Sequence, residues 1–199
     1  MKAKNRYRSV LNKSGFSYQE IKRINQLLVE DTPKAEIKRL VFEENILQQT
    51  SFDMRRRIWK EIEHRLQTLD KEAMQLLSSQ DRESSSALVL YSILQIDLLF
   101  LEFSRTIYLD KLLTFHHEIT KKEVIHFIEN QIIKDEKAKK WSTSTINKLA
   151  GTYLRILIEV GMLSRDHQIQ KLVLSPETES YLREKGYQPS VEVVLGELL

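Results

Sequence analysis

The feature that most constrains this chain is an apolar run, ALVLYSILQIDLLFLEF, over residues 87–103. Its length is close to the roughly 20 residues that a helix needs to cross a bilayer. Polar residues interrupt the run, however, and an aspartate at mid-span, here Asp97, costs about 3 kcal/mol on insertion scales. A buried helix at the centre of a helical bundle explains the same pattern without that cost. We therefore expect a soluble, cytoplasmic protein, with a membrane span as the less favoured alternative.

The composition favours long helices. Only 5 glycines and 3 prolines occur in 199 residues, and these are the residues that break helices and form turns. The chain has no cysteine, which excludes disulfides and thiolate metal sites. Its first ten residues are basic but lead into no apolar segment, so we expect no secretory signal.

Helix start signals and apolar repeats predict a helical bundle domain over residues 1–115. Ser17 and Glu20 have the spacing of a capping box, and Thr32 with Pro33 marks a second helix start. Ser51 is placed to cap a third helix, whose apolar stripe recurs nearly every fourth residue: Met54, Ile58, Ile62, Leu66 and Leu69. Beyond it we expect a short helix near residues 74–77, a polar loop at 80–86, the central helix at 87–103, and another helix at 107–113.

A second domain is expected over residues 116–199. Thr120 and Glu123 repeat the capping-box spacing, and a later helix starts at Ser142 or Ser144 and ends at Gly161. Two short apolar runs around the polar turn 165–168 then predict a two-stranded β-hairpin, followed by a helix from Pro176 to Lys185. The order helix, helix, hairpin, helix resembles a winged helix, although the charged linker at 133–140 is longer than the usual turn. The fold class is therefore mostly α, a helical bundle followed by a winged-helix-like α+β region.

The basic residues are clustered, although the formal net charge is only +3. One cluster lies in residues 1–13 (Lys2, Lys4, Arg6, Arg8 and Lys13), a second in residues 55–60, and a third in residues 134–148. Such clusters suit a surface that binds a polyanion. The alternative for each cluster is an ordinary solvated helix face, and the first arm has the further alternative of disorder.

The helix start at residues 142–148 is one candidate for DNA contact. Free backbone amides and the helix dipole favour a phosphate at such an end, and an asparagine such as Asn147 has the groups to pair with an adenine edge. The alternative is a run of ordinary capping residues. The candidate DNA-binding residues here are Lys140, Ser142, Thr143, Ser144, Thr145, Asn147 and Lys148.

The second candidate for DNA contact is the run Arg55, Arg56 and Arg57 with Lys60. Successive residues on a helix turn by about 100°, so the three arginines do not face one ligand together, but two of them can share a face with Lys60. The alternative is a set of surface ion pairs, such as Arg57 with Glu61.

No constellation of residues indicates catalysis. His116 and His117 are adjacent and lack a third metal ligand at a suitable spacing. The run Ser84–Ser86 has no flanking glycine to form a nucleophile elbow, and no glycine-rich phosphate loop occurs. We therefore predict a protein that is not an enzyme and needs no cofactor or metal.

Three stretches carry a resemblance to a known family: YRSVLNKSGFSYQEIKRINQLLVED at 7–31, EENILQQTSFDMRRRIWKEIEHRLQTL at 43–69, and WSTSTINKLAGTYLRILIEVGML at 141–163. Together they resemble the BrxA family of BREX phage-defence systems, once catalogued as inner-membrane proteins. The resemblance implies a NusB-like helical N-terminal part, binding to double-stranded DNA, and an accessory role beside a methyltransferase and an ATPase. It assigns no individual contact residue, and the membrane label conflicts with the polar interruptions in 87–103.

These observations predict a DNA-binding accessory protein of phage defence that contacts mainly the DNA backbone. Two alternatives remain open at the level of sequence. The second hypothesis is an adaptor in which the helical part docks another BREX component, and the third is binding of RNA by the NusB-like half. The sequence predicts neither a sequence specificity nor an oligomeric state.

Overall fold

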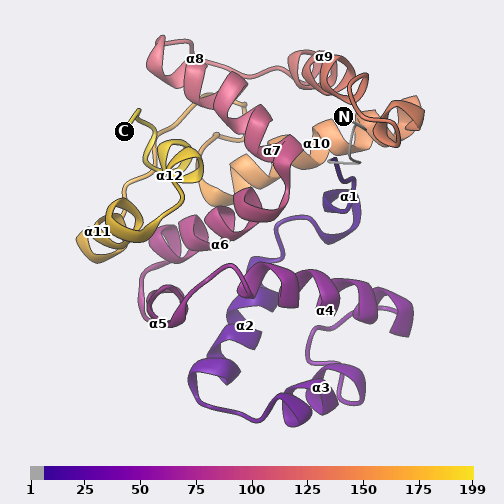
Figure 1. The fold of residues 1–199 in the computed structure, drawn as a ribbon, viewed down its shortest axis with the longest axis vertical. Helices are drawn as coiled ribbons and strands as arrows, with labels where there is room; N and C mark the ends of the chain where they lie inside the picture. Colours follow the sequence, from indigo (N-terminus) through magenta and orange to yellow (C-terminus); the bar gives the residue numbers. More distant parts are fainter. Residues whose placement is uncertain (1–6) are drawn as a thin grey trace.

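A computed structural model describes residues 7–199 and shows helices joined by short loops (Figure 1). Helices α2, α3 and α4 lie at one end, α8 and α9 lie at the other, and α6 runs between them. The elements of the first part are α1 (Leu11–Ser14), α2 (Tyr18–Val29), α3 (Lys34–Phe42), α4 (Phe52–Leu66), α5 (Lys71–Ser79) and α6 (Arg82–Ile96). The later elements are α7 (Leu98–Phe103), a π-helix (Ser104–Leu109), α8 (Asp110–Leu113), α9 (Lys121–Ile132), a 3₁₀ turn (Ala138–Lys140), α10 (Thr143–Val160), α11 (Pro176–Lys185) and α12 (Gln188–Leu195).

The prediction of a winged-helix-like region with a β-hairpin is wrong. Residues 7–199 contain no strand, and the expected hairpin is reduced to isolated bridges, Leu163 with Ile169 and Glu118 with Gln168. Two hydrogen bonds of the expected hairpin form, from the Ser164 amide to the Gln168 carbonyl (2.9 Å) and from the Gln170 amide to the Met162 carbonyl (3.0 Å), but the segment after α10 also bonds to other parts of the chain. The Ile169 amide donates to the carbonyl of His117 at 2.8 Å, and the Tyr108 hydroxyl donates to the carbonyl of Gln170 at 2.7 Å. These contacts hold the segment against Tyr108 and His117, and its pairing does not extend beyond isolated bridges.

The apolar run 87–103 forms two helices and not the single helix that we expected. The chain bends by 112° between Arg82–Ile96 and Leu98–Leu113. Asp97 causes the break, because its backbone is extended and its carboxylate accepts a hydrogen bond from the Phe100 amide at 3.1 Å, which starts α7. Within residues 7–199, no single helix is long and apolar enough to cross a membrane, and only this bent pair meets the criteria of length and composition together.

The predicted loop at residues 80–86 is also wrong beyond its first two residues. Asp81 caps α6 by accepting from the Ser84 amide at 2.9 Å, so the three serines that follow are helical and buried. Their hydroxyl groups join α6 to its neighbours. Ser84 Oγ accepts from the Ser175 amide at 2.8 Å, and Ser85 Oγ lies 2.7 Å from the Tyr18 hydroxyl.

Most of the predicted helix starts are confirmed. The side chains of Ser51 and Ser142 cap α4 and α10, and Thr120 with Glu123 forms the predicted capping box of α9. Gly161 ends α10 in the left-handed conformation, with φ of 95°. Each of these signals depends on neighbouring residues alone.

Two predicted starts differ in the structure. Ser17 has a left-handed backbone (φ 52°) and its hydroxyl donates to the Ser14 carbonyl at 2.6 Å, so it does not form a capping box with Glu20. Helix α3 begins at Lys34 with Pro33 before it, one residue later than Thr32 and Pro33 imply. Helix α12 was not predicted at all.

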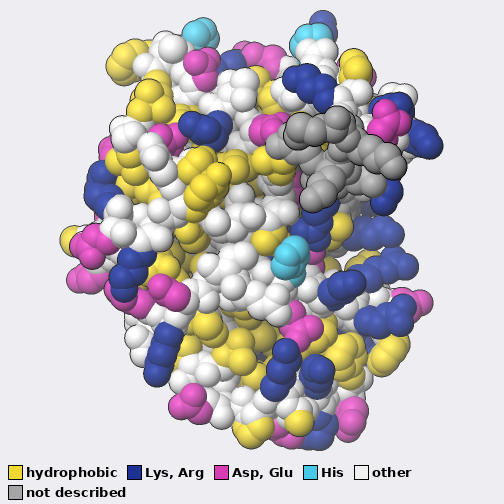
Figure 2. All heavy atoms as spheres, in the orientation of Figure 1, with side chains coloured by type: hydrophobic (Ala, Val, Ile, Leu, Met, Phe, Trp, Pro, Cys, Tyr) yellow, Lys and Arg dark blue, Asp and Glu magenta, His cyan; other side chains and the backbone are white. Residues whose placement is uncertain are grey.

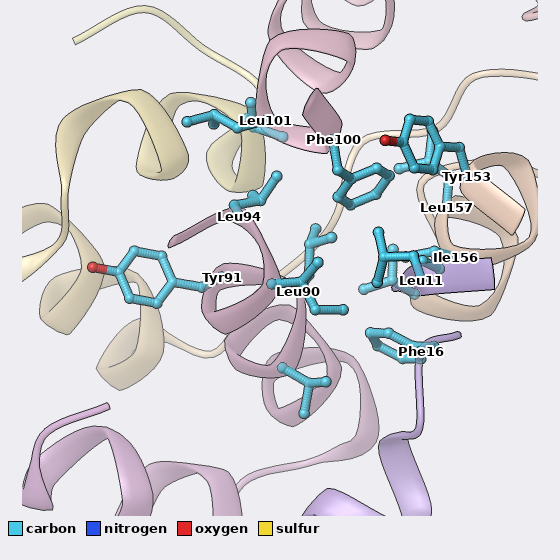
Figure 3. Packing of buried hydrophobic residues seen from close by; sticks show 14 of the residues in the cluster. Leu11, Phe16, Leu90, Tyr91, Leu94, Phe100, Leu101, Tyr153, Ile156 and Leu157 are labelled. Carbon is cyan, nitrogen blue, oxygen red and sulfur yellow. The ribbon is translucent and has the colours of Figure 1, made fainter. Parts of the chain in front are cut away.

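Helix α6 is the centre of the hydrophobic core, and it is buried on all its faces (Figure 3). Leu90 points toward Leu11 of α1 and Ile156 of α10, whereas Tyr91 points to the opposite side. There the Tyr91 hydroxyl accepts from the Tyr187 amide at 2.9 Å, just before α12. A helix that is covered in this way carries an apolar run without a hydrophilic face.

Helix α12 packs on α6 and the π-helix. Gln95 Nε2 donates to Ser190 Oγ at 3.0 Å, and Arg105 pairs with Glu192 at 2.8 Å. The end of the chain therefore contacts the predicted first domain directly. The division into residues 1–115 and 116–199, and the likeness to NusB, stay predictions.

Arg65 of α4 holds the loop between α1 and α2. Its side chain is fully buried, and it donates to the carbonyls of Phe16 (2.7 Å) and Gly15 (2.9 Å) and to Ser14 Oγ (3.0 Å). Glu61 lies 3.6 Å from its Nε atom. Burial lowers the pKa of Arg65 to about 10, which leaves the side chain a cation at neutral pH.

Replacement of this arginine should therefore be costly. We expect Arg65→Ala to lower the free energy of unfolding by about 3–5 kcal/mol, because it leaves the carbonyls of Gly15 and Phe16 without their donor and empties a buried space. Urea denaturation followed by circular dichroism measures this loss. The control is Arg56→Ala, whose exposed ion pair with Asp53 should contribute about 0.5 kcal/mol or less. A loss below about 1 kcal/mol for Arg65→Ala would contradict the assigned role.

Candidate nucleic-acid interface

The short helix α1 lies between α4 and α10 and contacts both (Figure 1). Leu11 anchors α1 in the core, next to Ile156 of α10 (Figure 3). Asn12 Nδ2 donates to the carbonyl of Thr145 at 3.2 Å, which fixes α1 to the first turn of α10. The next residue, Lys13, is exposed. Helix α4 and helix α10, which carry the two predicted DNA-contact clusters, thus lie on either side of α1.

A cavity of about 300 Å³, which we name the α4 hollow, lies between α4 and the chain around α1. Arg57 and Lys60 of α4 line it on one side, and Arg8 and Lys13 line it on the other. Only Arg57 of the three arginines therefore shares this face with Lys60, whereas the helical spacing allowed two. The alternative pairing of Arg57 with Glu61 is not formed, because Glu61 pairs with Arg8 at 2.8 Å.

The other two arginines of the cluster face elsewhere. Arg55 donates to the carbonyl of Phe42 at 2.6 Å and lies 5.8 Å from the Phe52 ring, so it ties α4 to the end of α3. Arg56 forms an exposed ion pair with Asp53 at 3.5 Å. Neither side chain lines the α4 hollow.

On the other side of α1, a polar groove of about 390 Å³ lies between the α1–α2 loop and α10, and we name it the α10 groove. Four cationic residues line it: Lys13, Arg82, Lys148 and Arg155. Lys148 belongs to the predicted cluster, whereas Arg82 and Arg155 were not predicted. Arg155 lies seven residues after Lys148, which places both on one face of α10 and is a signal that the sequence contained. No local pattern identifies Arg82, because it reaches the groove from α6.

Two carboxylates, Glu20 and Glu159, also line the α10 groove. Partial burial raises the pKa of Glu159, and the charges of Arg155 and Arg82 act in the opposite direction. The four cations outnumber these acids, so the groove keeps a positive balance and suits an anion.

The predicted helix start at 142–148 is largely occupied by its own hydrogen bonds. Ser142 Oγ accepts from the Thr145 amide at 3.2 Å, and Asn147 Nδ2 donates to the carbonyl of Thr143 at 2.9 Å. Thr143 and Ser144 are exposed, as is Lys140 in the turn before the helix. In this segment only Lys148 lines the groove.

Lys13 lines both the α4 hollow and the α10 groove, so the two sites form one continuous cationic surface. We name this surface the α1 band. In the described part of the chain, none of its members forms an ion pair with another side chain. Figure 2 shows Lys and Arg side chains gathered at the edge of the molecule where α1 and α4 lie in Figure 1. The α1 band comprises Lys13, Arg57, Lys60, Arg82, Lys148 and Arg155.

The rest of the predicted N-terminal basic arm adds less to this surface. Arg8 lines the α4 hollow, but its guanidinium is committed to Glu61 and to the Ile96 carbonyl. Lys2, Lys4 and Arg6 lie outside the described residues.

The residues considered for catalysis or metal binding do not converge. Within residues 7–199, no group of three potential ligands is placed to hold a metal ion. His116 and His117 are both exposed, and the serines of the 84–86 run are buried in α6. That the protein is not an enzyme stays a prediction.

Comparison with known proteins gives the family. The sequence profile of the BrxA family matches residues 5–186 of this chain. The chain belongs to the BrxA family. The family confirms the resemblance seen in the three sequence stretches, and it makes this chain a relative of proteins of BREX phage-defence systems.

Relatives named BREX protein BrxA match over most of their length. One from Bacillus cereus (strain H3081.97) is 29% identical over 194 residues, which is 96% of this chain and 97% of the relative. One from Paramagnetospirillum magneticum (strain AMB-1) is 26% identical and covers 94% of each chain. One from Escherichia coli O9:H4 (strain HS) is 24% identical, over 87% of this chain and 82% of the relative.

A solved structure has the same fold. The crystal structure of an uncharacterized protein from Magnetospirillum magneticum superposes with a TM-score of 0.82 at 25% sequence identity. The match covers 96% of this chain and all of that one. The helical architecture around the α1 band is therefore shared by this related protein.

Asp97 is a buried carboxyl group, near enough to Arg8 and Glu61 to interact with their charges, that makes stability depend on pH. Burial raises the pKa of Asp97 from 3.8 to about 6, although the Phe100 amide and the charges of Arg8 and Arg65 favour its ionised form. Since the pKa in the folded state lies above that of the unfolded chain, the folded protein takes up the proton first. This group therefore adds stability as the pH falls from about 6 to about 4, and the gain is lost as the pH rises through 6.

Asp97→Asn tests this assignment. The amide oxygen can still accept from the Phe100 amide, but the titration is gone. We expect the free energy of unfolding of the natural protein to rise relative to that of the variant when the pH is lowered from 7 to 5. Chemical denaturation of both proteins at both pH values measures the difference. An identical pH dependence of the unfolding free energy in the two proteins would contradict the assignment of this titration to Asp97.

Proposed function

We propose that this protein is a non-catalytic accessory component of a BREX system that binds double-stranded DNA along the α1 band. The proposal rests on the position of Lys13. This residue lines both the α4 hollow and the α10 groove, so it joins the cations of α4 to those of α10 and α6. Cations that form no ion pair with a carboxylate keep their charge available for phosphates.

The kinds of side chain in the α1 band favour contact with the DNA backbone over base reading. Lysines and arginines on rigid helices match phosphate oxygens, which carry no sequence information. The one amide considered for base reading, Asn147, is bonded back to the carbonyl of Thr143. Binding of this kind is sequence-tolerant and strongly dependent on salt, because each neutralised phosphate releases counterions.

A mobility-shift titration of a duplex at two salt concentrations tests the proposal. We expect the logarithm of the association constant to fall by about 0.9 per neutralised phosphate for each tenfold rise in salt. Absence of binding at low salt would refute the proposal, and preferential binding of structured RNA in competition would assign the surface to RNA instead.

Two double charge reversals separate the halves of the α1 band. Arg57→Glu with Lys60→Glu alters the α4 side, and Lys148→Glu with Arg155→Glu alters the α10 side. We expect each pair to weaken duplex binding by about tenfold or more and to flatten the salt dependence.

The matched control is Lys71→Glu with Lys122→Glu. These two lysines are exposed near the starts of α5 and α9, line neither site, and give the same change in net charge. The control should change affinity by about twofold or less, because charge far from the contact surface is screened. An equal loss in the control and in the band variants would show that only net charge matters, which contradicts a defined interface.

A further inference from the structure

The α4 hollow has features that phosphate-backbone binding does not explain. One of its walls is a face of α4, where Arg57, Lys60 and His64 follow one another at helical spacing. The other wall is formed by Val10, just before α1, and by Lys13 of α1. A phosphate backbone needs a basic surface, but it does not need a cavity.

The inside of the hollow is largely carbon. Ile58 lies at its base with 4% of its surface exposed, and Val10 is 36% exposed beside it. The aliphatic stems of Lys13, Arg57 and Lys60 extend the apolar lining, because such side chains bury their methylenes and keep their charge in water. A volume of about 300 Å³ lies at the lower end of the range for small-molecule sites. The hollow therefore suits one small molecule with an apolar part.

The charges around the hollow specify an anion. Glu61 is the one acid that lines it, and its carboxylate is already paired with Arg8 at 2.8 Å. Lys13, Arg57 and Lys60 have no such partner within residues 7–199. Several cations around one cavity suit a phosphate, which carries more than one negative charge and several acceptor oxygens.

A polar edge within the hollow favours a heteroaromatic ring over an aliphatic chain. His64 Nδ1 lies 3.4 Å from the Arg8 guanidinium, and its Nε2 atom forms no hydrogen bond with the described residues. A nucleobase offers ring nitrogens and exocyclic groups to such an atom, together with flat apolar faces. An aliphatic chain offers no hydrogen-bonding partner.

We propose that the α4 hollow binds one nucleoside monophosphate, with the base against Val10 and Ile58 and the phosphate held by Lys13, Arg57 and Lys60. Two sources supply this chemistry. One is a free nucleotide, and the other is a nucleotide that stands outside the base stack of a DNA strand, in which case the inference rests on the proposed DNA binding.

Calorimetric titration of the full chain tests the class of ligand. The probes are 2′-deoxyadenosine 5′-monophosphate, inorganic phosphate and 2′-deoxyadenosine. We expect the nucleotide to bind at least about tenfold more tightly than either fragment, since it alone fills the cavity and meets the cations. No binding of the nucleotide at millimolar concentration, or equal binding of inorganic phosphate, would overturn the proposal.

Val10→Trp fills the hollow without a change of charge, and it should abolish nucleotide binding while leaving paired-duplex affinity within about twofold. The matched control is Val173→Trp, at a residue that is 77% exposed and lines neither site. Should Val10→Trp fail to fold, His64→Ala serves instead, and a loss of about tenfold in nucleotide affinity is expected from it. Unchanged nucleotide binding in the folded variants would overturn the proposal.

Two duplexes distinguish the sources of the ligand. If the hollow takes a nucleotide from a strand, a duplex with a single-nucleotide bulge binds more tightly than the fully paired one, and Val10→Trp removes that preference. If it takes a free nucleotide, the two duplexes bind equally. Failure of the proposed DNA binding appears separately, as the loss of paired-duplex binding while the calorimetric result with the mononucleotide stands.

Discussion

The buried guanidinium of Arg65 is the interaction on which the arrangement of this protein depends. It donates hydrogen bonds to the Ser14 hydroxyl and to the carbonyls of Gly15 and Phe16. These groups lie in a turn, where regular secondary structure does not supply their hydrogen-bond partners. Because this turn is held against α4, the short helix α1 before it is fixed between α4 and α10, and Lys13 reaches both. A helix of four residues is not stable by itself, so its position is a property of the tertiary structure.

The broken apolar run has a similar cause. Asp97 is an expensive residue to bury, and its raised pKa records that cost. Its carboxylate nevertheless caps the start of α7 by accepting a hydrogen bond from the Phe100 amide. The chain bends by 112° there, so the two halves of one apolar sequence pack in different directions. The polar interruption that argues against a bilayer-spanning helix is thus the same residue that turns the core.

Most of the local signals in the sequence are confirmed, although the start predicted at Ser17 and the one predicted at Thr32 with Pro33 are not. The caps at Ser51, Thr120 and Ser142 and the left-handed Gly161 need only their neighbours in the chain, and all are found. The sequence also identified Arg57, Lys60 and Lys148, three of the six residues of the α1 band, as DNA-contact candidates. The predicted β-hairpin is wrong because only isolated bridges form there, while the Gln170 carbonyl bonds to Tyr108, 62 residues earlier, and the Ile169 amide bonds to His117.

By itself, the sequence determined that the chain is helical, where most helices begin, and that it belongs to the BrxA family, because propensity, capping and sequence similarity depend on residues read in order. The tertiary structure alone decided which cations act together. Arg82 and Lys148 are 66 positions apart and Lys13 precedes both, yet all three line one groove. Packing around α6 brings them together. Charges that are far apart in the chain share a surface only after the core has formed and fixed the helices that carry them.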